Sequence, residues 1–290
     1  MSNANVYQVI ASRLISLIET SGTLPWQRPW SATRQMSAVS QRPYRGINAV
    51  MTELSASISG YTDPRWVTFK QAQALGGGVR KGEKGTPILF FSIKEDDEDE
   101  DDKRSFAFAR YYTVFNVAQC DLPEGALPPL AIQPRCVADD LVERARDLCR
   151  QLGPSLSHGG NGACYVPSQD AIHMPVVEIF ADSASYFAVM AHEMAHATGH
   201  TSRLARPGFD RVAAFGSETY SFEELVAEFG AAFVCAAEGV ERSSLERNSA
   251  AYLQGWLRAL KADPSALVRA AGHAQKAADM VLGVSNARDS

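Results

Sequence analysis

Proline is concentrated in one stretch near the middle of the chain, LPEGALPPLAIQP at residues 122–134, which holds four prolines and a glycine. Proline fixes φ and lacks a backbone N–H, so neither a helix nor a central strand can run through such a stretch. A periodic helical pattern, VADDLVERARDLCRQLG, begins directly after it. The chain is therefore predicted to form two domains, residues 1–125 and 136–290, joined by a linker at 126–135.

The two parts carry opposite charge. Residues 1–122 contain fourteen basic and thirteen acidic side chains, but eight of the acidic ones form one run, EDDEDEDD at 95–102. Outside that run the counts are fourteen basic and five acidic, whereas residues 123–290 have fourteen basic and twenty acidic. A basic excess favours an anionic partner. We interpret the acidic run as a solvated hairpin tip; shielding of the basic surface, or imitation of a DNA backbone, is the alternative.

The first domain is predicted to be α+β. Helical spacing of apolar residues begins at Val6, and a second helical pattern covers GINAVMTELSAS. RWVTFKQAQALGG indicates a short strand that turns into a helix. The segments TPILFFSIK and RSFAFARYYTVFNVAQC are rich in β-branched and aromatic residues, which predicts a hairpin joined by the acidic run.

The second domain is predicted to be mainly helical. After the helix that follows the linker comes the segment ACYVPSQDAIHMP, which indicates extended structure or a hairpin. Two more helices are expected over MAHEMAHATGH and FEELVAEFGAAFVCAAEG, followed by others near the C-terminus.

The compartment is predicted from cysteine use and hydropathy. Five cysteines, odd in number and without a Cys-x-x-Cys pair, fit neither a disulfide framework nor a thiolate zinc site. The chain has no run of eighteen apolar residues, and its first twenty residues lack the basic flank and short apolar core of an export signal. We expect a soluble cytoplasmic protein with no membrane partner.

The stretch MAHEMAHATGH, residues 190–200, is the strongest chemical signal. His192 and His196 are four residues apart, so in a helix both imidazoles can reach one ion. Glu193 lies about 100° further round the axis, where it reaches a water beside the ion rather than the ion itself. The alternative is a helix whose histidines only hydrogen-bond to neighbours. His200 is assigned to structure or to the cleft rim, because it lies beyond Gly199, where the helix is expected to end.

A zinc ion bound by two histidines needs one more protein ligand and an open position for water. Glu224 and Glu228 share one face of the next helix. We predict Glu224 as the ligand and Glu228 as the group that orients an imidazole through its free N–H; the reverse assignment stays open, as does a solvated stripe of acids. Glu223 is expected to point elsewhere. One Zn²⁺ per chain is predicted, with other divalent metals as alternatives.

Such a site predicts metal-assisted hydrolysis of a carbonyl compound. Glu193 would accept a proton from a water whose pKa the metal lowers. Tyr220, just before the second metal helix, is the candidate oxyanion donor. The segment DAIHMP is the candidate for pairing with a substrate backbone.

Basic and aromatic residues alternate through the first domain. This pattern suits single-stranded nucleic acid, whose phosphates attract cations and whose bases stack on aromatic rings. The glycines and cations of GGGVRKGEKG allow backbone amides to approach a phosphate closely, although the Walker spacing is absent. About half of the aromatics are expected in the core instead. The candidate DNA-binding residues are Trp26, Arg28, Trp30, Arg42, Tyr44, Arg45, Arg65, Trp66, Lys70, Arg80, Lys81, Lys84, Arg110 and Tyr111.

Motifs over nearly the whole chain closely resemble the ArdC antirestriction family of conjugative plasmids. They are LPWQRPW, RPYRGINAVM, WVTFKQAQALGGGVRKGEKGTPILFF, ARYYTVFNVAQCDLP, HEMAHATGH and FEELVAEFGAAFVC, and those of the first half recur in plasmid primases of the TraC type. The resemblance implies an N-terminal domain that binds single-stranded DNA and a C-terminal zincin-like metallopeptidase domain, which together protect incoming plasmid DNA from host restriction. It implies His192, His196 and a glutamate of EELVAE as ligands and Glu193 as catalytic base.

Three hypotheses for the function follow. The first is an antirestriction protein with an active zinc peptidase site, whose substrate is an unknown protein or peptide, with the restriction machinery as one candidate. The second is a DNA-binding or decoy protein whose metal site is structural or idle. The third is an accessory factor in conjugative DNA priming.

Overall fold

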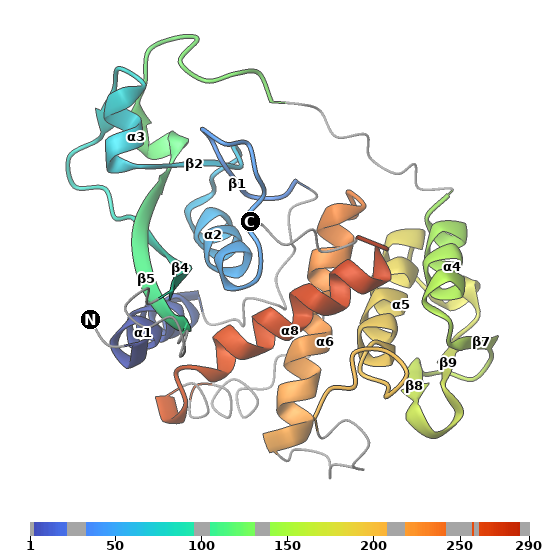
Figure 1. Cartoon of the computed structure of the whole chain (residues 1–290). Coiled ribbons are helices and arrows are strands. Elements are labelled where there is room, and N and C mark those ends of the chain that lie inside the picture. Colours follow the sequence, from blue (N-terminus) through green and yellow to red (C-terminus); the bar gives the residue numbers. More distant parts are fainter. Residues whose placement is uncertain are drawn as a thin grey trace. The chain divides into compact units, whose positions relative to one another are not determined.

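The computed structural model describes residues 3–21, 33–95, 105–130, 140–207, 218–241, 257 and 261–284 (Figure 1). These residues form two compact units. Among them, unit 1 comprises 3–21, 34–95, 105–130, 257 and 261–268, and unit 2 comprises 33, 140–207, 218–241 and 269–284. The predicted linker stays a prediction, because residues 131–135 lie outside the described part of the chain.

Unit 1 is α+β, as predicted. Its helices and strands are α1 (Asn3–Ser21), β1 (Met36–Ser37), α2 (Ile47–Ser59), β2 (Arg65–Thr68), α3 (Phe69–Ala74), β3 (Gly78–Val79), β4 (Thr86–Glu95), β5 (Ser105–Asn116) and β6 (Cys120–Asp121). Four strands form one sheet in the order β1-β2-β5-β4, in which β1 and β2 are parallel and the other neighbours antiparallel. A separate pair joins β3 to β6.

The predicted hairpin is confirmed. Strands β4 and β5 pair antiparallel without interruption from Thr86 opposite Val114 to Glu95 opposite Ser105. The acidic run from residue 96 onward lies outside the described residues, so its role stays a prediction.

The core of unit 1 lies where α1 and α2 pack on the β4–β5 ribbon. One face of α1 is buried at helical spacing, as its apolar pattern predicted, through Ile10, Leu14 and Ile18. The side chain of Asn48 on α2 donates to the carbonyl of Leu89 at 2.7 Å and accepts from its N–H at 2.6 Å. This pair of bonds fixes the start of α2 against the outer edge of β4.

Unit 2 contains a small sheet and the helices that carry the histidine motif. Its elements include α4 (Leu141–Leu152), β7 (Ser155–His158), β8 (Cys164–Val166), β9 (Ala171–Met174), α5 (Ser183–Ala197), α6 (Glu218–Ala237) and most of α8 (Ala266–Val281). The sheet order is β7-β9-β8, with β7 parallel and β8 antiparallel to β9. Helix α5 packs against α4, α6, β8 and β9. No helix in the described ranges is long and apolar enough to span a bilayer.

Candidate metal centre and nucleic-acid interface

Helix α5 holds the HExxH motif in the interior of unit 2. Asp182 caps its N-terminus, where the side chain accepts a hydrogen bond from the N–H of Ser185 at 2.7 Å. Its residues Phe187, Met190 and Met194 are fully buried, so apolar packing fixes the rotation of the helix about its axis. His192 and His196 are consequently held on one face, one turn apart.

Helix α6 passes very close to α5 because small residues meet at the crossing. A Cβ atom placed on Gly230 would lie 2.9 Å from the Cβ of Ala195, which is closer than packed carbon atoms come. Glycine at 230 and alanine at 195 therefore allow the two backbones to approach. This approach brings the acidic side chains of α6 within reach of the two imidazoles.

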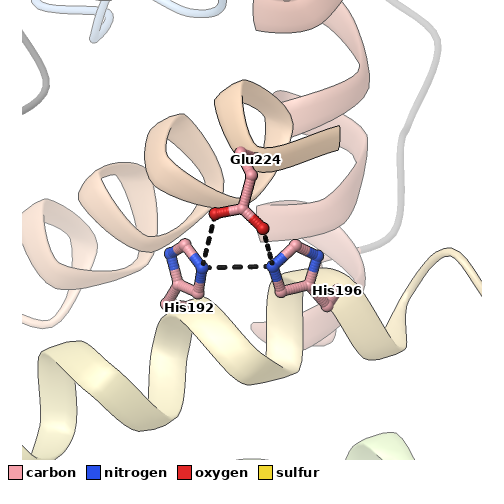
Figure 2. A group of neighbouring side chains, drawn as sticks. All are labelled: His192, His196 and Glu224. Carbon is pink, nitrogen blue, oxygen red and sulfur yellow. Dashed lines mark hydrogen bonds and ion pairs between the residues drawn. The ribbon is translucent and has the colours of Figure 1, made fainter. Parts of the chain in front are cut away.

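His192, His196 and Glu224 face one another across the two helices (Figure 2). The Nε2 atoms of the two histidines are 3.1 Å apart. The two carboxylate oxygens of Glu224 lie 3.7 Å from Nε2 of His192 and 3.5 Å from Nε2 of His196. Each residue offers one donor atom, and the three donor atoms lie within 4.8 Å of one another, as a shared metal ion requires. Two imidazoles and one carboxylate form the donor set of a catalytic zinc site with an open position.

Glu223 does not point elsewhere, contrary to the expectation from helical spacing. Its Oε1 lies 3.3 Å from Nδ1 of His196, so it accepts a hydrogen bond from the imidazole nitrogen that faces away from Glu224. The guanidinium of Arg206 binds both oxygens of Glu223 and also donates to the carbonyls of Ala195 and His196. The expectation failed because Arg206, in the loop after α5, holds Glu223 toward the histidine.

Glu228 lies beside the other histidine. Its Oε1 is 3.7 Å from Nδ1 of His192, which is longer than a hydrogen bond but close enough for an ion pair with a charged imidazole. Each imidazole therefore has one nitrogen directed at the shared centre and the other near a separate carboxylate. Carboxylates in these positions select the tautomer that leaves Nε2 available to a metal.

The carboxylates raise the pKa of His196. Burial alone lowers that pKa, but the hydrogen bonds with Glu223 and Glu224 outweigh burial and raise the value to about 10. Burial raises the pKa of Glu224, yet the two histidines reverse this effect and lower it. The metal-free protein therefore holds a protonated His196 and an ionised Glu224 at neutral pH.

Metal affinity is accordingly expected to depend on pH at values well above the usual pKa of histidine. A metal ion binds Nε2 of His196 only after its proton leaves, so the affinity for Mn²⁺ should rise about tenfold per unit between about pH 7 and pH 9. A histidine with the ordinary pKa of about 6.5 would give constant affinity over that interval. Titration calorimetry at several pH values measures the slope, and a flat profile contradicts the prediction.

The other residues predicted near the motif, Glu193, His200 and Tyr220, do not all lie close to the metal-binding group. Glu193 is buried and lies in electrostatic range of His196 and of Cys164 on β8. His200 lies past the end of α5, where its Nδ1 contacts Ser202, and it is outside the metal-binding group found among the described residues. Tyr220 falls in the first turn of α6 instead of before it, and its side chain lies outside the described part of the structure.

The segment DAIHMP cannot pair with a substrate, because it forms the central strand of its sheet. Strand β9 is hydrogen-bonded to β7 on one side and to β8 on the other. Among the described residues, the strand next to α5 with no pairing partner on its outer edge is β8, which the sequence did not distinguish from β9.

The predicted DNA-binding residues are only partly surface residues. Trp26, Arg28 and Trp30 lie outside the described residues. Trp66 was expected to contact DNA, but it is fully buried, and its Nε1 donates to Gln35 at 2.7 Å, so it is a core residue. Arg65 is mostly buried in an ion pair with Asp63. Tyr44 and Tyr111 are partly buried, and the exposed candidates are Arg42, Arg45, Lys70, Arg80, Lys81, Lys84 and Arg110.

Sequence reasoning missed Arg206 and misjudged Glu223, which act together on His196. No sequence pattern around Arg206 indicates its role, because its partners lie on two other elements, Ala195 on α5 and Glu223 on α6. One feature of the sequence could have drawn attention to Glu223. Three glutamates occur within six residues of α6, and helical periodicity places only two of them on one face, so the third needs a partner of its own.

Two helices joined around a His, His, Glu donor set define a zincin-like metallopeptidase domain. A family model described as a zincin-like metallopeptidase matches residues 143–273. A second, described as the N-terminal domain of anti-restriction factor ArdC, matches residues 4–115. The chain belongs to the ArdC antirestriction family.

Solved structures support the same assignment over the whole chain. The metal-free crystal structure of antirestriction protein ArdC from plasmid R388 matches with a TM-score of 0.76 and 38% identity, covering 96% of this chain and 97% of that one. Its Mn(II)-bound structure matches with a TM-score of 0.73 and 37% identity, covering 97% and 99%. The R388 relative has therefore been crystallised with a divalent metal bound.

Sequence relatives include full-length and partial matches. The uncharacterized protein y4eC of Sinorhizobium fredii (strain NBRC 101917 / NGR234) is 36% identical over 288 residues, covering 95% of this chain and 91% of y4eC. DNA primase TraC of Escherichia coli is 37% identical over 300 residues. That match covers 95% of this chain but only 27% of TraC, so the chain corresponds to about a quarter of the primase.

Proposed function

We propose that this protein is a metal-dependent peptidase of the antirestriction type that binds single-stranded DNA through unit 1. In this role it protects incoming plasmid DNA from host restriction. The observation that carries the proposal is the convergence of His192, His196 and Glu224, whose donor atoms lie within 4.8 Å of one another. Membership of the ArdC family supplies the antirestriction context.

The proposed ligands of the metal are these three side chains, with one ion per chain. Zn²⁺ is the proposed metal, because two imidazoles and one carboxylate match its preferences. Mn²⁺ is the main competitor, since the related R388 protein has been crystallised with Mn(II). When bound, such a cation supplies a Lewis acid that polarises a carbonyl and acidifies water.

The protein's own residues would divide the remaining work. Glu193, buried beside His196, would accept a proton from water at its carboxylate and pass it to the leaving amine. Glu223 and Glu228 would hold the imidazoles in orientation. The outer edge of β8, which no described strand pairs with, lies next to α5 and would pair with an extended peptide, so that the substrate would lie near Glu193. Tyr220 remains the proposed oxyanion donor.

The proposed DNA-binding activity rests on charge and exposure in unit 1. Seven of the predicted basic residues are exposed there. Single-stranded DNA is the proposed ligand, because exposed aromatic side chains accompany these cations and can stack on unpaired bases.

A role in DNA priming is the second candidate. The observation that favours it is the 37% identity to a segment of DNA primase TraC. Strand-extension assays with a separate primase, in the presence and absence of this protein, test it.

The variant Glu193→Gln tests the peptidase proposal. It should keep metal content and DNA binding, because Glu193 is neither a proposed ligand nor part of unit 1. Protection of a conjugated plasmid should be lost, since removal of a general base costs about a hundredfold or more in rate. Protection is measured as the ratio of transfer into restricting and non-restricting recipients.

His200→Ala is the matched control, because His200 lies beside the motif but outside the metal-binding group of the described residues. It should protect like the natural protein. If Glu193→Gln protects equally well while its metal and DNA binding are intact, the site is idle and the non-catalytic decoy becomes the better account.

A further inference from the structure

An exposed pair of aromatic rings lies on the ribbon of β4 and β5 in unit 1. Phe90 and Tyr112 are 54% and 45% exposed, and their rings meet edge to face, with centroids 6.0 Å apart and planes at 80° to each other. Contact between rings on two neighbouring strands requires both side chains to project from the same face of the sheet. The two rings therefore form one small platform on that face.

The pairing of β4 with β5 defines the rest of this face. Phe90 is opposite Arg110, and Tyr112 is opposite Ile88, two residues before Phe90. Side chains alternate between the two faces of a strand, so every second residue belongs to the same face. The positions of this face with a described side chain include one cation and no acidic residue; they are Thr86, Ile88, Phe90, Arg110, Tyr112 and Val114.

One end of the face is covered and the other is open. Val114 is buried in a cluster with Ala56 of α2, and Ile88 packs against that cluster. Phe90 and Tyr112 lie further along the ribbon and are exposed. The uncovered part of a sheet face normally carries polar side chains, so two neighbouring aromatic rings at this end indicate a binding surface.

Area and charge favour a single-stranded nucleic acid as the occupant. Two half-exposed rings present roughly 200 Å² of apolar surface, whereas a stable interface with another protein buries about 800 Å² on each side. One unpaired base needs only a single ring to stack on. Arg110, which is exposed and directly opposite Phe90, places positive charge beside that ring, as a phosphate chain requires.

The angle between the two rings determines how a base can bind. Because their planes are 80° apart, one base cannot lie parallel to both rings. Phe90 is the more exposed of the two and is the one opposite Arg110. Tyr112 meets Phe90 edge to face, which is a favourable arrangement of two aromatic rings and restricts the rotation of Phe90.

We propose that one unpaired base of a single-stranded nucleic acid stacks on the ring of Phe90, while Tyr112 holds that ring in orientation and Arg110 lies beside the phosphate chain. The site deepens the proposed DNA-binding function of unit 1 and rests on it. Stacking on a ring does not read the identity of a base, so the site accepts strands of any sequence. A duplex cannot use it, because its bases are stacked on one another.

The first test measures binding of a fluorescein-labelled (dT)12 oligonucleotide to the full chain by anisotropy. Phe90→Ala and Phe90→Leu should each weaken binding by about tenfold, without changing the slope of log affinity against log salt. The leucine variant keeps an apolar side chain, so it controls for loss of packing. Phe91→Ala is the matched control and should bind like the natural protein, because Phe91 is 52% exposed on the same strand but projects from the opposite face.

The second test separates the base from the phosphates. A fluorescein-labelled abasic strand of the same length offers the same charge without bases, so Phe90→Ala should bind it as well as the natural protein does. Arg110→Met should weaken binding of both strands and reduce the salt slope by about 0.7. Tyr112→Ala should weaken (dT)12 binding by only about threefold, because Tyr112 orients the ring on which the base stacks.

The outcomes distinguish failure of this site from failure of DNA binding. If (dT)12 binds the natural protein but both Phe90 variants behave like Phe91→Ala, the site is refuted while DNA binding stands. Equal losses of Phe90→Ala on (dT)12 and on the abasic strand would also refute stacking, because the residue would then act through the fold. If (dT)12 does not bind the natural protein at all, both proposals fail.

Discussion

The variant Glu224→Ala is expected to weaken Mn²⁺ or Zn²⁺ binding by roughly a hundredfold or more, whereas Glu228→Ala should weaken it by about tenfold. Glu224 presents both oxygens to the shared centre between the histidines. Binding free energies of zinc sites with four ligands correspond to about 3 kcal/mol per ligand, which is more than a hundredfold in affinity. Glu228 lies 3.7 Å from Nδ1 of His192, the nitrogen that faces away from the shared centre, and loss of such an orienting group costs about tenfold in affinity.

Titration calorimetry of the two purified variants measures this difference, with metal content after dialysis as a second readout. The two glutamates are on the same helix, one turn apart, so each variant controls for the loss of helix packing in the other. Equal losses for both variants would contradict the assignment of Glu224 as ligand. A larger loss of metal affinity for Glu228→Ala would mean that the reverse assignment is correct, with Glu228 as the ligand and Glu224 as the orienting group.

The metal-binding motif could be predicted because its geometry is local. Residues four apart on one helix share a face whatever surrounds the helix, so His192 and His196 needed no tertiary information. Glu224 could be proposed from the same rule applied to a second helix. The sequence favoured Glu224 but left the exchange with Glu228 open, because the choice depends on the position of α6 along α5, which the close packing of Gly230 and Ala195 sets.

Most elements were predicted, including the short strand and helix β2 and α3 and the extended segment that forms β8 and β9, but the short strand β7 was missed. The apolar stripe of α1 and the long hairpin of β4 and β5 match the sequence interpretation. Strand β7 was missed because its sequence, SLSH, is short and largely exposed, and it forms only by pairing with β9, which follows it by more than ten residues. Because β7 and β8 pair with the two edges of β9, β9 cannot pair with a substrate.

Aromatic residues were the least predictable part of the candidate interface. Trp66 and Phe90 both lie in strands of the same sheet, in segments that are rich in aromatic and β-branched residues. Trp66 is fully buried because α2 covers its strand and Gln35 supplies an acceptor for its indole N–H, whereas Phe90 is exposed. Residue type and spacing predict neither the helix that covers Trp66 nor the acceptor for its indole N–H.

Arg206 provides the second prediction with a large effect, since it links protein stability to metal binding. The variant Arg206→Met should lower the free energy of unfolding of the metal-free protein by about 3 kcal/mol, because it removes the guanidinium that pairs with both oxygens of the poorly exposed Glu223 carboxylate and leaves this carboxylate with His196 as its charged partner. It should also weaken metal binding by about tenfold, because Glu223 is then no longer held against Nδ1 of His196.

A second substitution separates the two effects. The double variant Arg206→Met, Glu223→Gln also removes the carboxylate that has lost its guanidinium partner and should recover most of the lost stability. Its metal affinity should stay low, since neither side chain then orients His196 as the ionised pair does. Arg203→Met is the matched control: Arg203 lies in the same loop and is also poorly exposed, but it binds Asp170 and the carbonyl of Ala197. It should lose stability and keep its metal affinity. If Arg203→Met and Arg206→Met weaken metal binding equally, the loop acts only by supporting the fold, and Arg206 has no specific effect on His196.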